Sequence, residues 1–495
     1  MLDSRRNPLH LRYEAPDWVR AAYVVVLIAM LSVPLVAMPF APRPEVLEKR
    51  ELAEPPRIVD EVGNLNADVL AEAGGFFTDH FAFRPYLVDL NATIREKLLM
   101  VSATPNVVVG TDGWLYYAGE LGDYQGTNRM SDAALDNAAA NLALMNEYVK
   151  AQGKNFVVVI APNKSTIADS HMPYYIIETD ADSNLYRLVP RLKRKGVPYV
   201  EARRVLSEGL FFRRDSHWND EGAYAVAGQI SAALGGPRAD LSASSVVLDE
   251  HRGDLDVMLH PVTAQAEKQL LRQGAENFEI VNGAAGIEDS YVVTNSTADV
   301  GDTSILLYRD SFANNLAAPL ATVYKQAVFT KLVPYDMSAA QIGFADDIVI
   351  ERAERHISGF ATMPPYMPAP ERQIAQVTDV LHYGATINAI RRDPYLVVEG
   401  TLKDQVLLGQ EVYCQLSYAS GIVRTYACFR VSEDREGTED FEGQRAQDNG
   451  NIVGDAGYRV YVKVEGSDVP QRVRILVGTS DSAQEVASAK LEGWV

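Results

Sequence analysis

Cysteine and basic residues are both scarce in this chain. Its 495 residues include two cysteines, which excludes a disulfide-rich scaffold and a zinc site built from cysteines. Acidic residues outnumber basic ones by 66 to 46, so the formal net charge is −20. Because nucleic-acid affinity depends on neutralising phosphates, such a chain would need a segregated basic patch, and none is visible in the sequence. We therefore expect no nucleic-acid partner, and no metal or cofactor is predicted.

Long hydrophobic runs are scarce too, with one exception. Residues 21–40 (AAYVVVLIAMLSVPLVAMPF) carry no charge and have the length of a membrane-spanning helix. Four arginines precede the run, the last being Arg20, which favours a cytoplasmic N-terminus. Pro34 and Pro39 weaken the distal part, and a cleaved signal peptide is the alternative. We predict a cytoplasmic tail over 1–20, a single-pass inner-membrane anchor over 21–40, and a periplasmic remainder in an oxidising compartment.

The remaining chain reads as two folded parts, in keeping with 47% hydrophobic and 23% charged residues. Residues 41–61 are rich in proline and charge and are typical of a tether. Over 62–360, apolar strands alternate with helices, which predicts an α/β domain with a parallel sheet flanked by helices. The expected strands are 156–160, 197–200, 304–308, 327–330 and 347–351, with a hairpin over 106–109 and 114–117. A proline-rich linker is expected over 361–384.

Residues 385–495 alternate with a period of two, which predicts an antiparallel β-sandwich. We expect exposed tyrosines there, so that this domain is a candidate carbohydrate-binding module, with a structural or assembly role as the alternative. These tyrosines are Tyr413, Tyr418, Tyr426 and Tyr458. Cys414 and Cys428 are equidistant from Gly421, so a hairpin centred there would bring them opposite one another and permit a disulfide. Two buried thiols are the alternative.

The sharpest local signal is YRDSF, which places Ser311 directly after the buried strand SILLY and before a helical stretch. Such a turn lies at the carboxyl edge of a parallel sheet, where open α/β folds bind ligands. The helix N-terminus there offers N–H donors that favour a developing oxyanion. Ser311 is therefore a candidate nucleophile, and helix capping is its alternative role.

A second segment, FRRDSHWNDEG, supplies what a serine nucleophile needs. An imidazole can take the hydroxyl proton, and a carboxylate can fix its tautomer. Asp215 and His217 are two residues apart in an expected loop, close enough to pair, and Trp218 could shield them from water. Alternatively, the segment is a surface loop that caps the next helix. Among the other histidines, His171 is the main competing base because Asp169 is near it.

Both segments resemble the alginate O-acetyltransferase AlgJ/AlgX family, within the SGNH-hydrolase-like superfamily. The resemblance extends to the blocks FFTDHFAFRPYLVDLN, DGWLYY, APNKSTI, GDL and DIVIERAER, in the family's order over roughly residues 62–358. It implies a periplasmic O-acetyltransferase with an SGNH-like sheet, in which Ser311 carries the acetyl group, His217 is the general base and Asp215 orients it.

The resemblance also implies partners. The acceptor would be an exported polysaccharide, and a membrane-bound O-acyltransferase would be the acetyl source. Many relatives have glycine where this chain has Arg309, so the oxyanion donors are open: the Ser311 N–H, Asn314 and Asn163 are candidates. A polysaccharide acetylesterase would use the same triad, and a non-catalytic polymer-binding scaffold of an export complex is a further alternative.

Two further features have structural and functional interpretations. Lys164, after the strand FVVVI, could contact an acidic sugar or neutralise a carboxylate, and the structural role is favoured. Trp114, Tyr116 and Tyr117 could stack on sugar rings, although hairpin aromatics more often pack in a core.

Overall fold

The computed structural model describes residues 16–38, 40, 53–59, 63–179, 181–237, 245–272, 277–378, 384–403, 410–434, 452–464 and 468–491. The described chain divides into two compact units. The first is Met1–Leu99 with Leu259–Thr263, and the second is Met100–Met258 with Ala264–Val495. The domain boundaries drawn from the sequence stay predictions.

Three helices form most of the first unit. They are α1 (Asp17–Ala37), α2 (Val69–His80) and α3 (Arg84–Ile94), which continues into a π-helical turn over Arg95–Leu99. Helix α1 coincides with the apolar run. Among the described residues, no helix meets the length and apolarity needed for a membrane crossing. The membrane anchor therefore stays a prediction.

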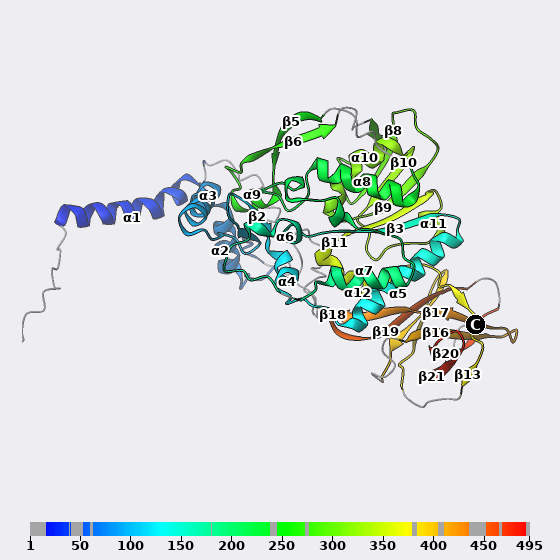
Figure 1. Cartoon of the computed structure of the whole chain (residues 1–495). Helices are drawn as coiled ribbons and strands as arrows, with labels where there is room; N and C mark the ends of the chain where they lie inside the picture. The colour runs from blue at the N-terminus through cyan, green and yellow to red at the C-terminus, as the bar shows by residue number, and fades with distance from the viewer. Residues whose placement is uncertain are drawn as a thin grey trace, which may run out of the picture. The chain divides into compact units, whose positions relative to one another are not determined.

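A seven-stranded sheet is the centre of the second unit, in the order β4-β3-β11-β9-β10-β8-β7; Figure 1 labels β3, β11, β9, β10 and β8 of it. Its five parallel strands are the five expected from the sequence, and this part of the prediction is confirmed. Strands β8 and β7 extend the sheet antiparallel and were not predicted. The bounds are β3 Asn155–Ala161, β4 Tyr199–Val200, β7 Phe278–Ile280, β8 Tyr291–Ser296, β9 Ser304–Tyr308, β10 Gln326–Thr330 and β11 Asp347–Ala353.

Helices cover both faces of this sheet because its strands are apolar on both sides. Val157 and Val159 of β3 belong to a core shared with α8 (Asp220–Leu234) and α10 (Ala317–Val323). Val158 and Ile160 belong to a second core shared with α5 (Asp132–Ala151) and α7 (Asn184–Arg194). Successive side chains of β3 thus point to opposite faces of the sheet and belong to two separate hydrophobic cores.

Smaller elements surround the sheet. The predicted hairpin is present as β1 and β2, in antiparallel register. A second antiparallel pair, β5 with β6, precedes and follows α9. The bounds are β1 Val107–Val109, β2 Leu115–Tyr117, α4 Leu121–Tyr124, α6 Lys164–Ile167, β5 Ser245–Arg252, α9 Asp254–Leu259, β6 Ala266–Arg272, α11 Ala339–Ile342 and α12 Gly359–Thr362.

The C-terminal region is β-rich, as expected. Its two sheets have the orders β12-β17-β16-β20-β21-β13 and β14-β15-β19-β18, and a common apolar core includes residues of both. All pairings are antiparallel except the short contact of β13 with β21. The bounds are β12 Glu371–Arg372, β13 Val377–Thr378, β14 Asn388–Arg392, β15 Tyr395–Thr401, β16 Glu411–Tyr418, β17 Val423–Ala427, β18 Phe429–Asp434, β19 Ile452–Lys463, β20 Pro470–Gly478 and β21 Ala483–Lys490.

The register of the β16–β17 hairpin corrects the expectation for the cysteines. Cys414 faces Tyr426, and the Cys428 N–H donates to the Val412 carbonyl at 2.9 Å. The hairpin is therefore centred one residue before Gly421, and the two cysteines do not lie opposite one another. Both are buried free thiols in this structure.

The tyrosines of this region are also unlike the expectation. Tyr413, Tyr426 and Tyr458 are buried, and Tyr418 is half-buried. They pack within the β-rich region instead of forming an exposed platform for sugar rings. The predicted carbohydrate-binding surface loses its main support, and a structural role accounts for these side chains.

Candidate active site

The turn after β9 presents Ser311 at the carboxyl edge of the parallel strands. Asp310 caps this turn: its carboxylate accepts hydrogen bonds from the Phe312 N–H at 3.0 Å and from the Ala353 N–H at 2.7 Å. The capping role that the sequence left open for Ser311 is thus filled by its neighbour. The Ser311 hydroxyl points instead to another segment of the chain.

That segment is the loop before α8. His217 Nε2 lies 3.0 Å from Ser311 Oγ, and its Nδ1 lies 2.6 Å from the Asp215 carboxylate. Asp215 also accepts the His217 N–H at 2.9 Å. Ninety-four residues separate the serine from the histidine in sequence, and the fold brings together the three side chains that sequence reasoning paired.

Aromatic side chains fix the imidazole. Phe312 meets the His217 ring edge-on at 4.8 Å and the buried Trp218 ring at 5.1 Å. Asn219 caps α8 by accepting the Gly222 N–H at 3.0 Å, which sets where the loop ends. Trp218 thus packs against Phe312, the ring that contacts the imidazole, and shielding of the pair from water stays a prediction.

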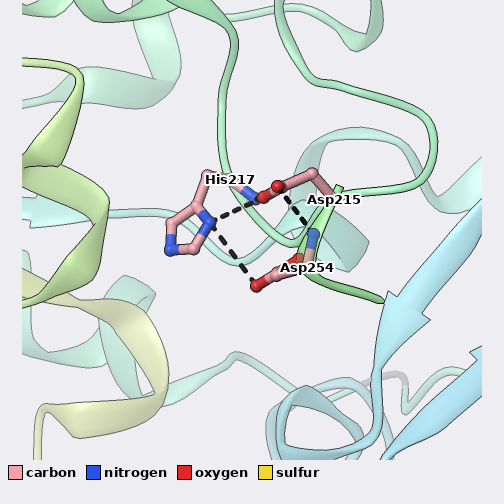
Figure 2. Close-up of side chains that lie close together, drawn as sticks. All are labelled: Asp215, His217 and Asp254. Carbon is pink, nitrogen blue, oxygen red and sulfur yellow. Dashed lines mark hydrogen bonds and ion pairs between the residues drawn. The ribbon is translucent and has the colours of Figure 1, made fainter. Parts of the chain in front are cut away.

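The second oxygen of Asp215 has partners that sequence reasoning missed. His251 Nε2 lies 2.8 Å from it, and the Asp254 N–H donates to it at 3.0 Å. The Asp254 carboxylate lies 3.7 Å from His217 Nδ1 and accepts from the Ser216 hydroxyl at 2.6 Å (Figure 2). Asp215 thus bridges two imidazoles and is held by the segment around residue 254.

A glycine makes this approach possible. A Cβ at Gly253 would lie 2.2 Å from the Arg214 carbonyl oxygen and 2.8 Å from the Asp215 nitrogen. The GDL block, noted in the sequence only as part of a family resemblance, therefore packs directly against the backbone that carries Asp215. This block was the one signal that could have located Asp254.

The charges of this cluster are strongly coupled. Burial by itself would lower the pKa of His217, but the charge and hydrogen bond of Asp215, with Asp254 adding, raise that pKa to about 9. Burial opposes ionisation of Asp215, yet His217 and His251 hold its pKa well below the usual range. For Asp254, burial and the nearby Asp215 charge raise the pKa. His217 and Asp215 accordingly form an ion pair in the resting site.

Asp215, His217 and Asp254 also lie close enough to one another to suggest a metal site (Figure 2). Their oxygens, however, are already acceptors. Both Asp215 oxygens take N–H donors, and the Asp254 oxygens take the Ser216 N–H, the Ser216 hydroxyl and the Leu255 N–H. A cation would have to displace these donors, so the arrangement fits a hydrogen-bonded relay and not a metal centre.

Below the serine turn lies a buried carboxyl group that the sequence did not single out. Glu351 of β11 is fully buried and accepts the Asp310 N–H at 3.1 Å. Burial, with the neighbouring Asp310 charge, raises the pKa of Glu351 well above its usual value. Both effects favour the uncharged form of the Glu351 carboxyl, which supports the turn by its hydrogen bond to the Asp310 N–H.

A guanidinium lies close to the serine turn. The Arg355 guanidinium carbon is 5.4 Å from the Phe312 ring centroid and 5.2 Å from that of Tyr117. Its charge also acts on His217, lowering the pKa of the imidazole against the effect of the carboxylates. Arg355 belongs to the DIVIERAER block, but sequence reasoning assigned it no role.

Two of the three predicted oxyanion donors have side chains that make other hydrogen bonds. Asn163 is fully buried, and its amide donates to Asp123 at 2.9 Å, so its structure gives no support to an oxyanion role. The Asn314 side-chain oxygen accepts a hydrogen bond from Arg309. The Ser311 N–H lies at the start of the capped turn, and its role as an oxyanion donor stays a prediction.

Lys164 has the structural role that the sequence favoured. Its buried ammonium donates to the carbonyls of Leu115 at 2.7 Å, Arg213 at 2.7 Å and Asp215 at 3.0 Å. It also lies 4.7 Å from the Trp114 ring centroid. Burial lowers the pKa of Lys164 to about 8. The lysine thus ties the β2 hairpin to the loop that carries Asp215, out of reach of a polymer.

The hairpin aromatics and the competing base are likewise structural. Trp114 and Tyr116 are buried, and Tyr117 is half-buried. His171 stacks on Trp114 at 4.8 Å, and its Nε2 lies 3.0 Å from Glu208. These contacts account for His171 without Ser311.

Comparison with known proteins shows which family part of this chain resembles. Residues 107–302 match the family model described as "SGNH hydrolase-like domain, acetyltransferase AlgX". This region is AlgJ/AlgX-like. The resemblance expected from the sequence is confirmed. The matched AlgX-type region contains Asp215 and His217 and ends before Ser311, so geometry alone joins the serine to the pair.

Individual relatives of the AlgJ/AlgX type are distant. The curated protein "Probable alginate O-acetylase AlgJ" of Pseudomonas fluorescens is 22% identical over 276 residues, which are 52% of this chain and 66% of that relative. The chain thus spans just under two thirds of the relative's length. The O-acetyltransferase domain of Pseudomonas putida AlgJ is 16% identical, with a TM-score of 0.37, covering 52% of this chain and 93% of that one. Pseudomonas aeruginosa AlgX is 13% identical, with a TM-score of 0.35, covering 78% and 92%.

Proposed function

We propose that this protein is a membrane-anchored periplasmic O-acetyltransferase that moves acetyl groups onto an exported polysaccharide through an acetyl-Ser311 intermediate. The observation that carries the proposal is the contact of Ser311 Oγ with His217 Nε2 at 3.0 Å, which joins the serine to a histidine of the AlgX-type region. A hydroxyl with an imidazole at that distance, itself held by a carboxylate, is the arrangement that acyl transfer requires.

The first half-reaction acetylates the enzyme. Ser311 Oγ attacks the carbonyl carbon of the donor's acetyl group while His217 Nε2 accepts the hydroxyl proton. Asp215 stabilises the imidazolium that forms. The tetrahedral oxyanion is stabilised by the Ser311 N–H and by the nearby positive charge of Arg355. As the intermediate collapses, His217 returns its proton to the departing donor group.

The second half-reaction reverses these roles. A sugar hydroxyl gives its proton to His217 and attacks the acetyl carbonyl, and Ser311 leaves with that proton. If water took the place of the sugar, the same steps would make the protein an acetylesterase. The acceptor therefore decides between transfer and hydrolysis, and exclusion of water from the cleft favours transfer.

The setting of the reaction follows from the same proposal. A membrane-bound O-acyltransferase would deliver acetyl groups across the inner membrane, and helix α1 would anchor the enzyme beside it. The family's alginate-modifying relatives support a polysaccharide acceptor. The β-rich region supports the catalytic region directly: Asn141 of α5 donates to the Arg430 carbonyl at 2.8 Å and accepts the Arg430 N–H at 2.9 Å.

Incubation of the full-length protein with a chromogenic acetyl ester tests the proposal. We expect a burst of released chromophore equal to the number of active sites, followed by slower turnover that accelerates when a polysaccharide acceptor is added. Ser311→Ala abolishes the burst, while Ser207→Ala, at an exposed serine outside the relay, serves as the matched hydroxyl control. Turnover unaffected by Ser311→Ala would exclude the acyl-serine. Polymer binding without any burst would favour a scaffold.

A further inference from the structure

Helix α3 and the π turn that follows it expose their apolar face, whereas an ordinary amphipathic helix buries it. Phe83, Leu87, Leu90 and Ile94 recur at three- and four-residue spacing and therefore share one face. That face is exposed: Leu90 retains 56% of its accessible surface and Ile94 45%. A surface helix normally buries such a stripe.

The opposite face of the same helix is the buried one; beside Ala92 it carries the acidic groups of this segment. Asp89 is buried and accepts the N–H groups of Val262 at 3.1 Å and Thr263 at 2.8 Å. Glu96 lies 2.6 Å from His260. These hydrogen bonds hold the helix within its own unit by its acidic side. The apolar face therefore points outward as a consequence of these contacts.

The charges that remain outward are positive. The acidic residues of α3 and the π turn are Asp89 and Glu96, both occupied by the contacts above, whereas Arg95 and Lys97 are exposed. In a chain with a net charge of −20 this is a local reversal of sign. Tyr86, with an exposed ring, adds a residue type that favours the boundary between lipid and water.

We propose that this surface, made of Phe83, Tyr86, Leu87, Leu90, Ile94, Arg95 and Lys97, docks on an anionic lipid bilayer as an interfacial helix. An apolar face bordered by basic side chains is the pattern that lies in the headgroup region of membranes. Charge complementarity selects anionic lipids. Helix α1 of the same unit also leaves Val25, Leu27 and Ile28 exposed, so two apolar surfaces of one unit suit the same partner. The docking does not depend on the acetyl-transfer chemistry.

The test places an environment-sensitive fluorophore on Leu90→Cys in the full-length chain, reconstituted into phosphatidylglycerol–phosphatidylethanolamine vesicles. Ile422→Cys, an exposed position of similar side-chain size in the β16–β17 hairpin, is the matched control. The native cysteines are buried, and burial raises the pKa of both thiols, so wild-type protein gives the labelling background.

We expect the probe at 90 to shift to the blue and to be quenched by lipid-borne quenchers, while the probe at 422 stays in water. Charge reversal by Arg95→Glu with Lys97→Glu, or vesicles of phosphatidylcholine alone, should reduce the quenching. Equal signals from positions 90 and 422, or a probe at 90 that is shielded only in native membranes and not in pure lipid, would overturn the proposal. The second result would indicate a protein partner.

Discussion

Asp215→Asn is the substitution on which the proposed relay makes the sharpest prediction. The Asp215 carboxylate accepts four hydrogen bonds, from His217 Nδ1, the His217 N–H, His251 Nε2 and the Asp254 N–H. An asparagine offers one oxygen and one amide nitrogen, so one imidazole must face an N–H donor. If that imidazole is His217, its proton moves to Nε2, and the nitrogen next to Ser311 can no longer accept.

The expected loss follows from that tautomer. Removing the orienting carboxylate of a Ser-His-Asp arrangement costs on the order of 10³- to 10⁴-fold in the acylation rate, with little change in ground-state binding. Asp215 is also the main reason that the pKa of His217 lies near 9. Its removal should therefore move the rising limb of the pH–rate profile to lower pH, towards the ordinary histidine pKa of about 6.5.

The assay is the pre-steady-state burst of a chromogenic acetyl ester, followed between pH 5 and pH 10 (roughly the range that spans both pKa values). Thermal unfolding of wild type and Asp215→Asn is the control for folding. Asp254→Asn, which leaves the hydrogen bond between Asp215 and His217 Nδ1 intact, should lose less activity than Asp215→Asn. A loss below about tenfold with an unchanged pH profile would refute the relay, because the carboxylate would then neither orient nor charge the imidazole.

Four further predictions follow from individual contacts. The acylation rate of the wild type should rise with pH up to about 9, because the base must be neutral to accept a proton, and a flat profile would contradict the raised pKa of His217. Because the pKa of His217 is raised to about 9 in the folded protein, protonated His217 stabilises the fold fully below its unfolded-state pKa of about 6.5. This stabilisation is lost as the pH rises through about 9, so the difference in unfolding free energy between wild type and His217→Gln, measured by urea titration, should shrink over that window. Lys164→Met should destabilise the protein by about 3 kcal/mol and lower the burst amplitude, because three buried carbonyls lose their donor; an unchanged melting temperature would argue against the tie. Glu351→Gln should cost less activity and stability than Glu351→Ala, since burial and the Asp310 charge favour the uncharged carboxyl, and equal losses in both would contradict this.

The parallel core of the fold was predictable from the sequence because its strands are uninterrupted apolar runs. SILLY and DIVIE bury residues on both faces, whereas the order of the strands in the sheet was not predicted. Strands β7 and β8 were missed because they lie at the antiparallel edge, where the pattern is mixed and side chains are partly exposed.

The partners in the active site were predictable only where they are adjacent in sequence or follow a recognisable strand. Asp215 and His217 are neighbours in the chain, and Ser311 was recognisable from its place after a buried strand. His251 was passed over because its sequence neighbourhood lacks the paired carboxylate and aromatic setting of His217; its partner Asp215 lies 36 residues away. The expected pairing of the two cysteines was wrong because the register of a hairpin depends on its turn. The turn is centred one residue before Gly421, and this shift places Cys414 opposite Tyr426 instead of Cys428.

Peptide mapping of the protein after brief incubation with an acetyl donor and acid quenching tests the central claim most directly. The account predicts one acetyl group on the peptide that contains Ser311, present in wild type, enriched when the acceptor is omitted, and absent from His217→Gln. An acetyl group carried on another residue while polysaccharide acetylation continues, or acetylation of Ser311 at an undiminished rate without His217, would contradict it.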